Sequence, residues 1–197
     1  MQIKVKAMGE YQTNCYIVTI DDKDIIIDPG VGATEWVKKN VTNPIAILNT
    51  HGHFDHVWSN AELQRELGVK LYAPKEDVML LKSSSWMPDL PPSTPDIIVE
   101  GDEELDIDGI KVKFRHFSGH TPGCSTIEIG DAMFSGDFIF KRSIGRSDFP
   151  YSNPIDMKKS LQKFQKLDFD KIIYPGHGGT TTIKEEQKYT PYWIERL

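Results

Sequence analysis

The sequence predicts an α/β protein in which mixed β-sheets are covered by helices. Each half of the chain reads as short apolar strands, then a helix, then a strand whose C-terminal end carries a histidine, His51 in the first half and His177 in the second. Strands and helices that alternate in this way do not fit a helical bundle or an all-β sandwich.

In the first half, apolar runs at residues 16–19 and 25–27 flank a polar turn and predict a hairpin. The second run stops at Asp28-Pro29-Gly30, where proline presets φ and glycine tolerates a positive φ. A helix is expected over residues 34–39, a buried strand over 45–48, and a second helix over 57–67. Gly68 stands where helices commonly end.

The second half begins after four prolines between residues 88 and 95, which exclude a regular helix there. Hairpins are predicted at 105–107 with 110–114 and at 126–129 with 132–134, because Asp-Gly and Gly-Asp turns separate these runs. A helix over 155–167 and a strand over 171–174 follow. The charged run 184–188 is interpreted as a solvated helix face, and core packing is expected for four aromatic residues: Trp58, Trp86, Tyr189 and Trp193.

Composition indicates a globular protein rather than a disordered one, since 39% of the 197 residues are hydrophobic. The formal net charge of −6 argues against nucleic acid as a partner, because phosphate binding depends on lysine and arginine. Two cysteines are too few for a disulfide framework. No segment resembles a signal peptide or a membrane span, so we expect a cytoplasmic protein that does not bind membranes.

The segment from Thr50 to His56 places three imidazoles and one carboxylate within six positions. His51 and His53 are two residues apart at a strand end and can point the same way. Asp55 and His56 follow at the entrance to the next helix. Neutral imidazoles and a carboxylate are typical ligands of hydrolytic metal sites, which also keep one position open for water.

Three further candidate ligands follow apolar runs on glycine-flanked loops, an arrangement in which a rigid scaffold holds functional loops. They are His120 in Ser-Gly-His-Thr-Pro-Gly, Asp137 in Ser-Gly-Asp, and His177 in Pro-Gly-His-Gly.

The segment His51-Gly52-His53-Phe54-Asp55-His56 resembles the H-x-H-x-D-H signature of the metallo-β-lactamase superfamily, and His120, Asp137 and His177 match its later ligand positions in order. Asp28-Pro29-Gly30 and Asn14-Cys15-Tyr16 resemble landmarks of its glyoxalase II-like branch. The resemblance implies a four-layer αββα sandwich of two mixed sheets flanked by helices, and two divalent metal ions per chain.

Carried over by position, the resemblance assigns His51, His53 and His120 to the first metal. Asp55, His56 and His177 would hold the second metal, and Asp137 would bridge the two. Zinc is expected, although iron and manganese also occur in this branch and these ligands do not exclude them.

The reaction implied is hydrolysis of a thioester of the S-lactoylglutathione type, which gives a carboxylic acid and a free thiol. A metal-bridging hydroxide would be the nucleophile, and the catalytic role of Asp55 would be to ligate one metal and orient that hydroxide. Three alternatives remain open: an iron-dependent persulfide dioxygenase, a broader thioesterase, and a metal-holding module without catalysis. The partner expected is a small-molecule thioester, and glutathione-derived thioesters are one candidate class.

The basic segment after Asp137 supplies two candidate substrate-binding residues, Lys141 and Arg146, of which Arg146 is better suited to bind a carboxylate. The competing interpretation is a solvated loop in which Asp148 pairs with Arg146. Asp28 is a candidate acceptor of a hydrogen bond from the metal loop. His116 falls outside the ligand pattern, and Cys124 follows the His120 loop without an assigned role.

Residues 1–197 are expected to form one hydrolase domain. Longer glyoxalase II enzymes carry a C-terminal helical domain that contributes glutathione contacts, and the 20 residues after His177 are too few for it. The resemblance therefore does not imply specificity for glutathione.

Overall fold

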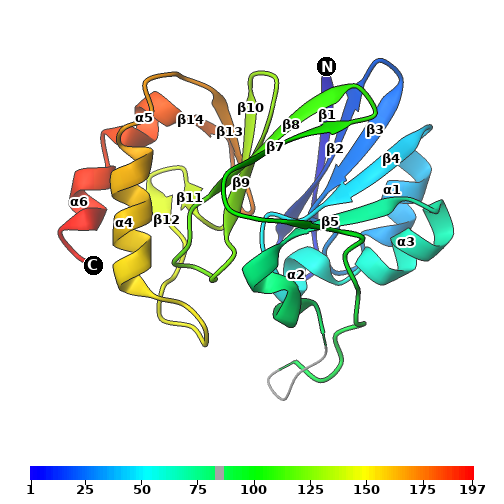
Figure 1. Cartoon of the computed structure of the whole chain (residues 1–197), viewed down its shortest axis with the longest axis horizontal. Helices are drawn as coiled ribbons and strands as arrows, with labels where there is room; N and C mark the ends of the chain where they lie inside the picture. The colour runs from blue at the N-terminus through cyan, green and yellow to red at the C-terminus, as the bar shows by residue number, and fades with distance from the viewer. Residues whose placement is uncertain (83–86) are drawn as a thin grey trace.

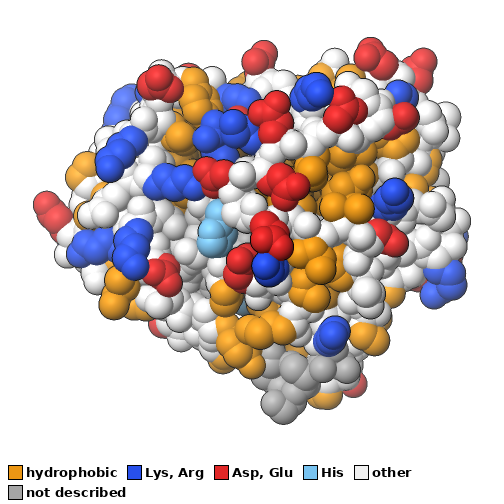
Figure 2. Space-filling view, in the orientation of Figure 1, with side chains coloured by type: hydrophobic (Ala, Val, Ile, Leu, Met, Phe, Trp, Pro, Cys, Tyr) orange, Lys and Arg blue, Asp and Glu red, His pale blue; other side chains and the backbone are white. Residues whose placement is uncertain are grey.

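Two mixed β-sheets pack face to face, and helices cover the outer face of each, in a computed structural model that describes residues 1–82 and 87–197 (Figure 1). This arrangement confirms the expected four-layer αββα sandwich. None of the helices in the described ranges is long and apolar enough to cross a membrane. Acidic and basic side chains are interspersed over the face displayed in Figure 2.

The first sheet contains six strands in chain order, antiparallel between its first three strands and parallel from the third onward. Its strands are β1 (Gln2–Met8), β2 (Thr13–Ile20), β3 (Lys23–Ile27), β4 (Pro44–Leu48), β5 (Lys70–Pro74) and β6 (Ile97–Val99). Strand β1 was not predicted from the sequence, because most of this edge strand is exposed or half-buried and it lacks a clear apolar alternation.

The second sheet has the order β14-β13-β10-β9-β8-β7, and β10 pairs with β13 in parallel. Its strands are β7 (Glu103–Ile107), β8 (Ile110–His116), β9 (Ser125–Ile129), β10 (Ala132–Gly136), β13 (Ile172–Pro175) and β14 (Thr181–Thr182). A small separate hairpin consists of β11 (Ile139–Phe140) and β12 (Ser143–Ile144). The two predicted hairpins of this half are therefore confirmed.

Three apolar clusters hold the four layers together. The central cluster lies between the sheets and includes Ile25, Leu48 and Phe114. Strand β3 also buries Ile26 on its opposite face, in the outer cluster of the first sheet. Strands such as β3 read as continuous apolar runs because both faces are covered.

The helices of the first half are α1 (Thr34–Asn40), α2 (Phe54–Val57) and α3 (Asn60–Leu67), and the 3₁₀ helix η1 (Lys75–Leu81) follows β5. The predicted helix over residues 57–67 is wrong at its start, since the chain bends between α2 and α3. Ser59 causes this bend by donating its backbone N–H to the Pro29 carbonyl at 3.0 Å and its hydroxyl to the Gly30 carbonyl at 2.7 Å. These bonds attach α2 to the turn after β3.

The helices of the second half are α4 (Pro154–Phe164), α5 (Ile183–Gln187) and α6 (Thr190–Ile194). The interpretation of 184–188 as a solvated face is wrong for Glu186 and Gln187, which are 1% and 9% exposed. Glu186 is bonded to other segments of the chain. Its carboxylate accepts hydrogen bonds from the Arg142 backbone N–H at 2.8 Å and the Thr181 hydroxyl at 2.5 Å. Trp58 and Trp193 pack against the outer clusters, whereas Trp86 lies outside the described residues.

Candidate metal centre

The seven candidate ligands follow strand ends at one edge of the sandwich, the edge at which α2 lies in Figure 1. His51 and His53 follow β4, Asp55 and His56 lie on α2, and His120 follows β8. The remaining two, Asp137 and His177, directly follow β10 and β13. Loops far apart in the sequence therefore meet at the same place.

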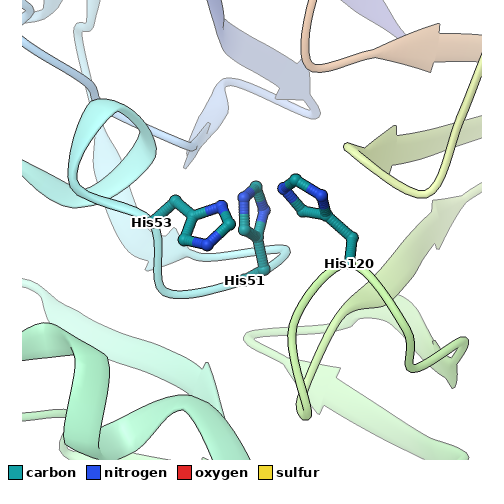
Figure 3. A group of neighbouring side chains, drawn as sticks. All are labelled: His51, His53 and His120. Atoms are coloured by element: carbon teal, nitrogen blue, oxygen red, sulfur yellow. The ribbon is translucent and has the colours of Figure 1, made fainter. Parts of the chain in front are cut away.

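A first group consists of His51, His53 and His120, whose ligand atoms all lie within 4.8 Å of one another. Figure 3 shows the three rings converging from two loops. All three residues are buried. Three imidazoles at this spacing are suited to hold one metal ion.

A second group consists of Asp55, His56 and His177, again with ligand atoms within 4.8 Å. Asp55 Oδ2 lies 3.6 Å from Nε2 of His56 and 3.5 Å from Nε2 of His177. The Thr13 hydroxyl donates to the same Oδ2 at 2.6 Å and so fixes the carboxylate.

Asp137 lies between the two groups. Its Oδ1 is 3.3 Å from Nε2 of His56, and its Oδ2 is 3.3 Å from Nε2 of His177 and 3.5 Å from Nε2 of His120. One carboxylate thus faces histidines of both groups.

The outer nitrogen of each of four histidines is held by a hydrogen bond that turns Nε2 toward the centre. Nδ1 of His120 donates to the Arg146 carbonyl at 2.7 Å, and Nδ1 of His177 donates to the Tyr11 carbonyl at 3.0 Å. Because a carbonyl only accepts, each Nδ1 carries a proton, and Nε2 is the nitrogen that can bind a metal.

Asp28 orients the rings of the other two histidines, His56 and His51. Its Oδ2 accepts from Nδ1 of His56 at 3.0 Å and from the Thr50 hydroxyl at 2.6 Å. The Thr50 oxygen, 3.1 Å from Nδ1 of His51, can then accept the proton of that ring. Asp28 therefore supports one histidine of each group, directly or through Thr50.

The atoms directed at the centre fit a metal better than they fit one another. Nε2 of His51, His56 and His120 and Oδ1 of Asp137 are buried and make no hydrogen bond within the described residues. Buried polar atoms without partners are costly, so such a set indicates a missing electrophilic partner. Their chemistry, imidazole nitrogen and carboxylate oxygen, suits a divalent transition metal.

In the metal-free protein the two groups differ in the direction in which the pKa values of their histidines are shifted. Burial lowers the pKa of His51 and His120, and burial with the neighbouring His120 lowers the pKa of His53 to about 3. These rings are neutral at pH 7, which is the form that binds metals.

In the second group the neighbouring carboxylates outweigh burial, so the histidine pKa values are raised. Burial opposes protonation of His56 and His177, but the Asp137 and Asp55 carboxylates outweigh it, so the pKa of His56 rises well above its usual value and that of His177 rises to about 9. His56 in turn overcomes the effect of burial on Asp55 and lowers its pKa to about 2. Metal binding here has to displace protons.

Sequence reasoning missed Asp77, a fully buried residue of η1 that joins the two loops of the first group. Its Oδ2 accepts from the Gly52 backbone N–H at 2.8 Å and the Thr121 hydroxyl at 2.6 Å. Its Oδ1 accepts from the Gly123 backbone N–H at 2.6 Å. No local pattern marks this acid, because its partners are distant in the sequence.

The start of β2 anchors the loop that carries His177. Asn14 donates its side-chain amide to the carbonyls of Pro175 at 3.0 Å and Gly178 at 2.9 Å. The Tyr16 hydroxyl also donates to Pro175 O at 2.6 Å. The Asn-Cys-Tyr landmark of the sequence therefore acts through these contacts, which sequence reasoning did not assign.

Gly176 is required by close approach at the second group. A Cβ at this position would lie 2.2 Å from Oδ1 of Asp137 and 2.7 Å from Cε1 of His56. Only glycine leaves room for these ligand side chains.

The two candidate substrate-binding residues, Arg146 and Lys141, differ in position. Arg146 lines a cavity of about 560 Å³ over the metal groups, whereas the exposed Lys141 is not among the residues that line it. The Arg146 side chain forms a bidentate ion pair with Asp148, at 2.9 and 2.8 Å, as the competing interpretation expected.

Two residues without an assigned role lie apart from the ligand groups. His116 donates from Nε2 to the Pro122 carbonyl at 2.7 Å and belongs to none of the metal-binding groups found in the described ranges. Cys124 is fully buried, and burial raises the pKa of its thiol well above the usual value. A protonated, buried thiol is unsuited to act as a nucleophile.

Comparison with known proteins agrees with this geometry. A family model described as the metallo-beta-lactamase superfamily matches residues 8–177. The chain is 33% identical to hydroxyacylglutathione hydrolase GloC of Haemophilus influenzae, with 98% of each chain covered. It is similar to the crystal structure of BLEG-1 B3 metallo-beta-lactamase, with a TM-score of 0.87, 28% identity and coverage of 98% of this chain and 99% of that one. It is also similar to TTHA1623 in a di-iron-bound form, with a TM-score of 0.81, 30% identity and coverage of 96% and 99%.

Proposed function

The chain is a metallo-hydrolase of the metallo-β-lactamase superfamily, and from this premise we propose that it hydrolyses thioesters at a dinuclear metal centre. The observation that carries the proposal is the pair of adjacent ligand groups with Asp137 between them at the base of one cavity. A single-metal function would leave Asp55, His56 and His177 without a role.

The ligand assignment follows the two groups. His51, His53 and His120 would hold one divalent ion, Asp55, His56 and His177 would hold the other, and Asp137, whose carboxylate faces both groups, would be shared between them. Two divalent ions at such a site supply Lewis-acid chemistry, which lowers the pKa of water from 15.7 to about 7 and polarises a carbonyl. The metal is proposed as zinc, and the di-iron form of TTHA1623 makes iron the first alternative to test.

Residues of the chain would orient the attacking water and the imidazole ligands. Asp55 lines the cavity and the Thr13 hydroxyl fixes its Oδ2, so this carboxylate would hold a metal and accept a hydrogen bond that orients the attacking water. Asp28, Thr50 and the carbonyls of Tyr11 and Arg146 fix the imidazole rings, which keeps the ligand geometry preorganised.

In the hydrolysis of a thioester, water adds to the acyl carbon and the carbon–sulfur bond breaks. The products are a carboxylic acid and a thiol. The name of the similar Haemophilus influenzae protein, hydroxyacylglutathione hydrolase, supports a thioester of the S-lactoylglutathione type as the first substrate to test. The cytoplasm is the proposed location.

The test is release of free thiol from S-D-lactoylglutathione by zinc-loaded protein, beside a chelator-stripped control and the Asp55→Ala variant. We expect metal-dependent release that falls at least about a hundredfold in the variant, because the variant loses both a metal ligand and the group that orients the nucleophile. Full activity and unchanged metal content in Asp55→Ala would refute its role. Lack of turnover by protein that holds one iron ion, with oxygen consumed in the presence of glutathione persulfide, would favour a persulfide dioxygenase instead.

A further inference from the structure

The cavity over the metal groups is bounded by aromatic side chains at both ends. On the side of His177 and Asp55, the ring of Tyr11 packs edge-on against Phe54 with centroids 5.2 Å apart. Tyr11 remains 61% exposed, so most of its surface is available to a ligand.

On the side of the first group, Phe149 presents its ring to the cavity. Its centroid lies 6.1 Å from that of His53 and 6.2 Å from that of His120, and Pro150 continues the same wall. Phe149 is 38% exposed although it is large and apolar. Exposed aromatic rings beside a polar centre are the usual way in which a cavity selects an apolar ligand group.

The positive charge available to a ligand is small. Among the described residues that line the cavity, Arg146 is the only lysine or arginine. Both Nε and Nη2 of its guanidinium are bonded to Asp148, and its plane covers Phe149, with the Cζ atom 4.1 Å from the ring centroid. A ligand carboxylate would meet Asp148 as well as Arg146, so the pair offers little net attraction to an anion.

Resting on the function proposed above, we propose that this cavity selects thioesters with an apolar, preferably aromatic, acyl group and an uncharged thiol portion. The acyl group lies against Phe149 and Pro150, and the thiol portion leaves past Tyr11 and Phe54. Glutathione, with two carboxylates, is then a tolerated carrier and not the recognised one.

The test uses four thioesters that vary one part at a time: acetyl and phenylacetyl groups, each on N-acetylcysteamine and on glutathione. Zinc-loaded protein with a measured metal content is assayed for thiol release. We expect kcat/KM to be about tenfold or more higher for phenylacetyl than for acetyl on the same thiol, within the range that hydrophobic pockets achieve. Changing N-acetylcysteamine to glutathione is expected to give no gain.

Three variants identify the residues responsible. Phe149→Ala should remove most of the phenylacetyl preference through a higher KM, while the acetyl thioesters change little. Tyr151→Ala, which alters a neighbouring exposed aromatic residue outside the cavity lining, should leave all four rates unchanged. Asp148→Asn should free Arg146 and raise kcat/KM for the glutathione thioesters severalfold relative to their N-acetylcysteamine counterparts.

A binding measurement separates this inference from the proposed function. The non-hydrolysable thioether S-phenethyl-N-acetylcysteamine should bind about tenfold more tightly than its S-ethyl analogue in calorimetry, and Phe149→Ala should abolish the difference. Turnover of all four thioesters without an acyl preference, or a tenfold gain from glutathione, would overturn the inference and leave the hydrolase standing. Preferential binding of the phenethyl thioether without any turnover would instead refute the hydrolase and support the selectivity of the cavity.

Discussion

Replacing Asp77 tests whether a residue outside the ligand set holds the first metal group together. Its carboxylate accepts three hydrogen bonds, from Gly52 between two ligand histidines and from Thr121 and Gly123 beside His120. In Asp77→Ala, three buried donors lose their partner, and each costs roughly 1–3 kcal/mol.

Removal of the Asp77 carboxylate also has a stabilising effect, which opposes the loss of the hydrogen bonds. Burial is the main reason that the pKa of Asp77 rises from 3.8 to about 6, despite the hydrogen bonds from Thr121 and the two glycines. A shift of this size corresponds to about 3 kcal/mol of cost to the charged form at pH 7. Removing the carboxylate recovers that cost, so we expect Asp77→Ala to lower the free energy of unfolding by about 2–4 kcal/mol and not by the full sum of three bonds.

Asp77→Ala should also weaken metal binding. The two loops that Asp77 joins carry His51, His53 and His120, and loss of a supporting bond of this kind typically weakens metal binding by about 10- to 100-fold. Urea denaturation of the metal-free protein measures the first effect, and zinc titration against a competing chelator measures the second. Glu76→Gln is the matched control, because it removes the same charge from the adjacent exposed position of η1.

Asp77 also predicts a dependence of stability on pH. Because its folded pKa is raised, the folded state holds the proton more tightly, and this contribution to stability is complete below pH 4 and lost as the pH rises through 6. The stability of the wild type relative to Asp77→Asn should therefore fall by about 2 kcal/mol between pH 4 and pH 7. Asp77→Ala behaving like Glu76→Gln in both stability and zinc affinity would refute this reasoning.

Three further predictions concern the second group. Zinc binding at pH 7 should release about two protons, because His56 and His177 have raised pKa values and must become neutral; calorimetry in buffers of different ionisation enthalpy measures the number, and release of none would contradict the electrostatics. Gly176→Ala should reduce the metal content below two ions per chain in elemental analysis, since the new Cβ would collide with Asp137 Oδ1; a folded variant with two tightly bound ions would exclude this clash. Asp28→Ala should weaken zinc affinity by about 10- to 100-fold through the loss of its bond to Nδ1 of His56, and an unchanged affinity in a competition titration would show that Asp28 serves only the turn.

The sequence revealed much of the candidate site because its ligands carry local signals. Three histidines and Asp55 stand within six positions, and the remaining ligands occupy glycine-flanked loops at strand ends. Strands with both faces buried are continuous apolar runs, so β3 and β4 were predicted within a residue or two of their bounds.

The parts that escaped prediction depend on contacts between distant segments. Asp77 bonds residues 25 to 46 positions away, and nothing in its neighbourhood distinguishes it from a surface acid. Glu186 likewise looks like part of a solvated helix face, yet it is buried against the turn at Arg142. The bend before α3 arises because Ser59 bonds the turn after β3. Arg146 was singled out for its side chain, whereas its backbone carbonyl orients His120.

The proposed dinuclear centre is tested most directly by titrating metal-free protein with zinc while thioester hydrolysis and bound metal are measured on the same samples. Two adjacent ligand groups that share Asp137 predict binding of two ions per chain, with most of the activity arising as the second ion binds. Full thioesterase activity at one ion per chain, with Asp55, His56 and His177 replaceable by alanine without loss, would contradict the account.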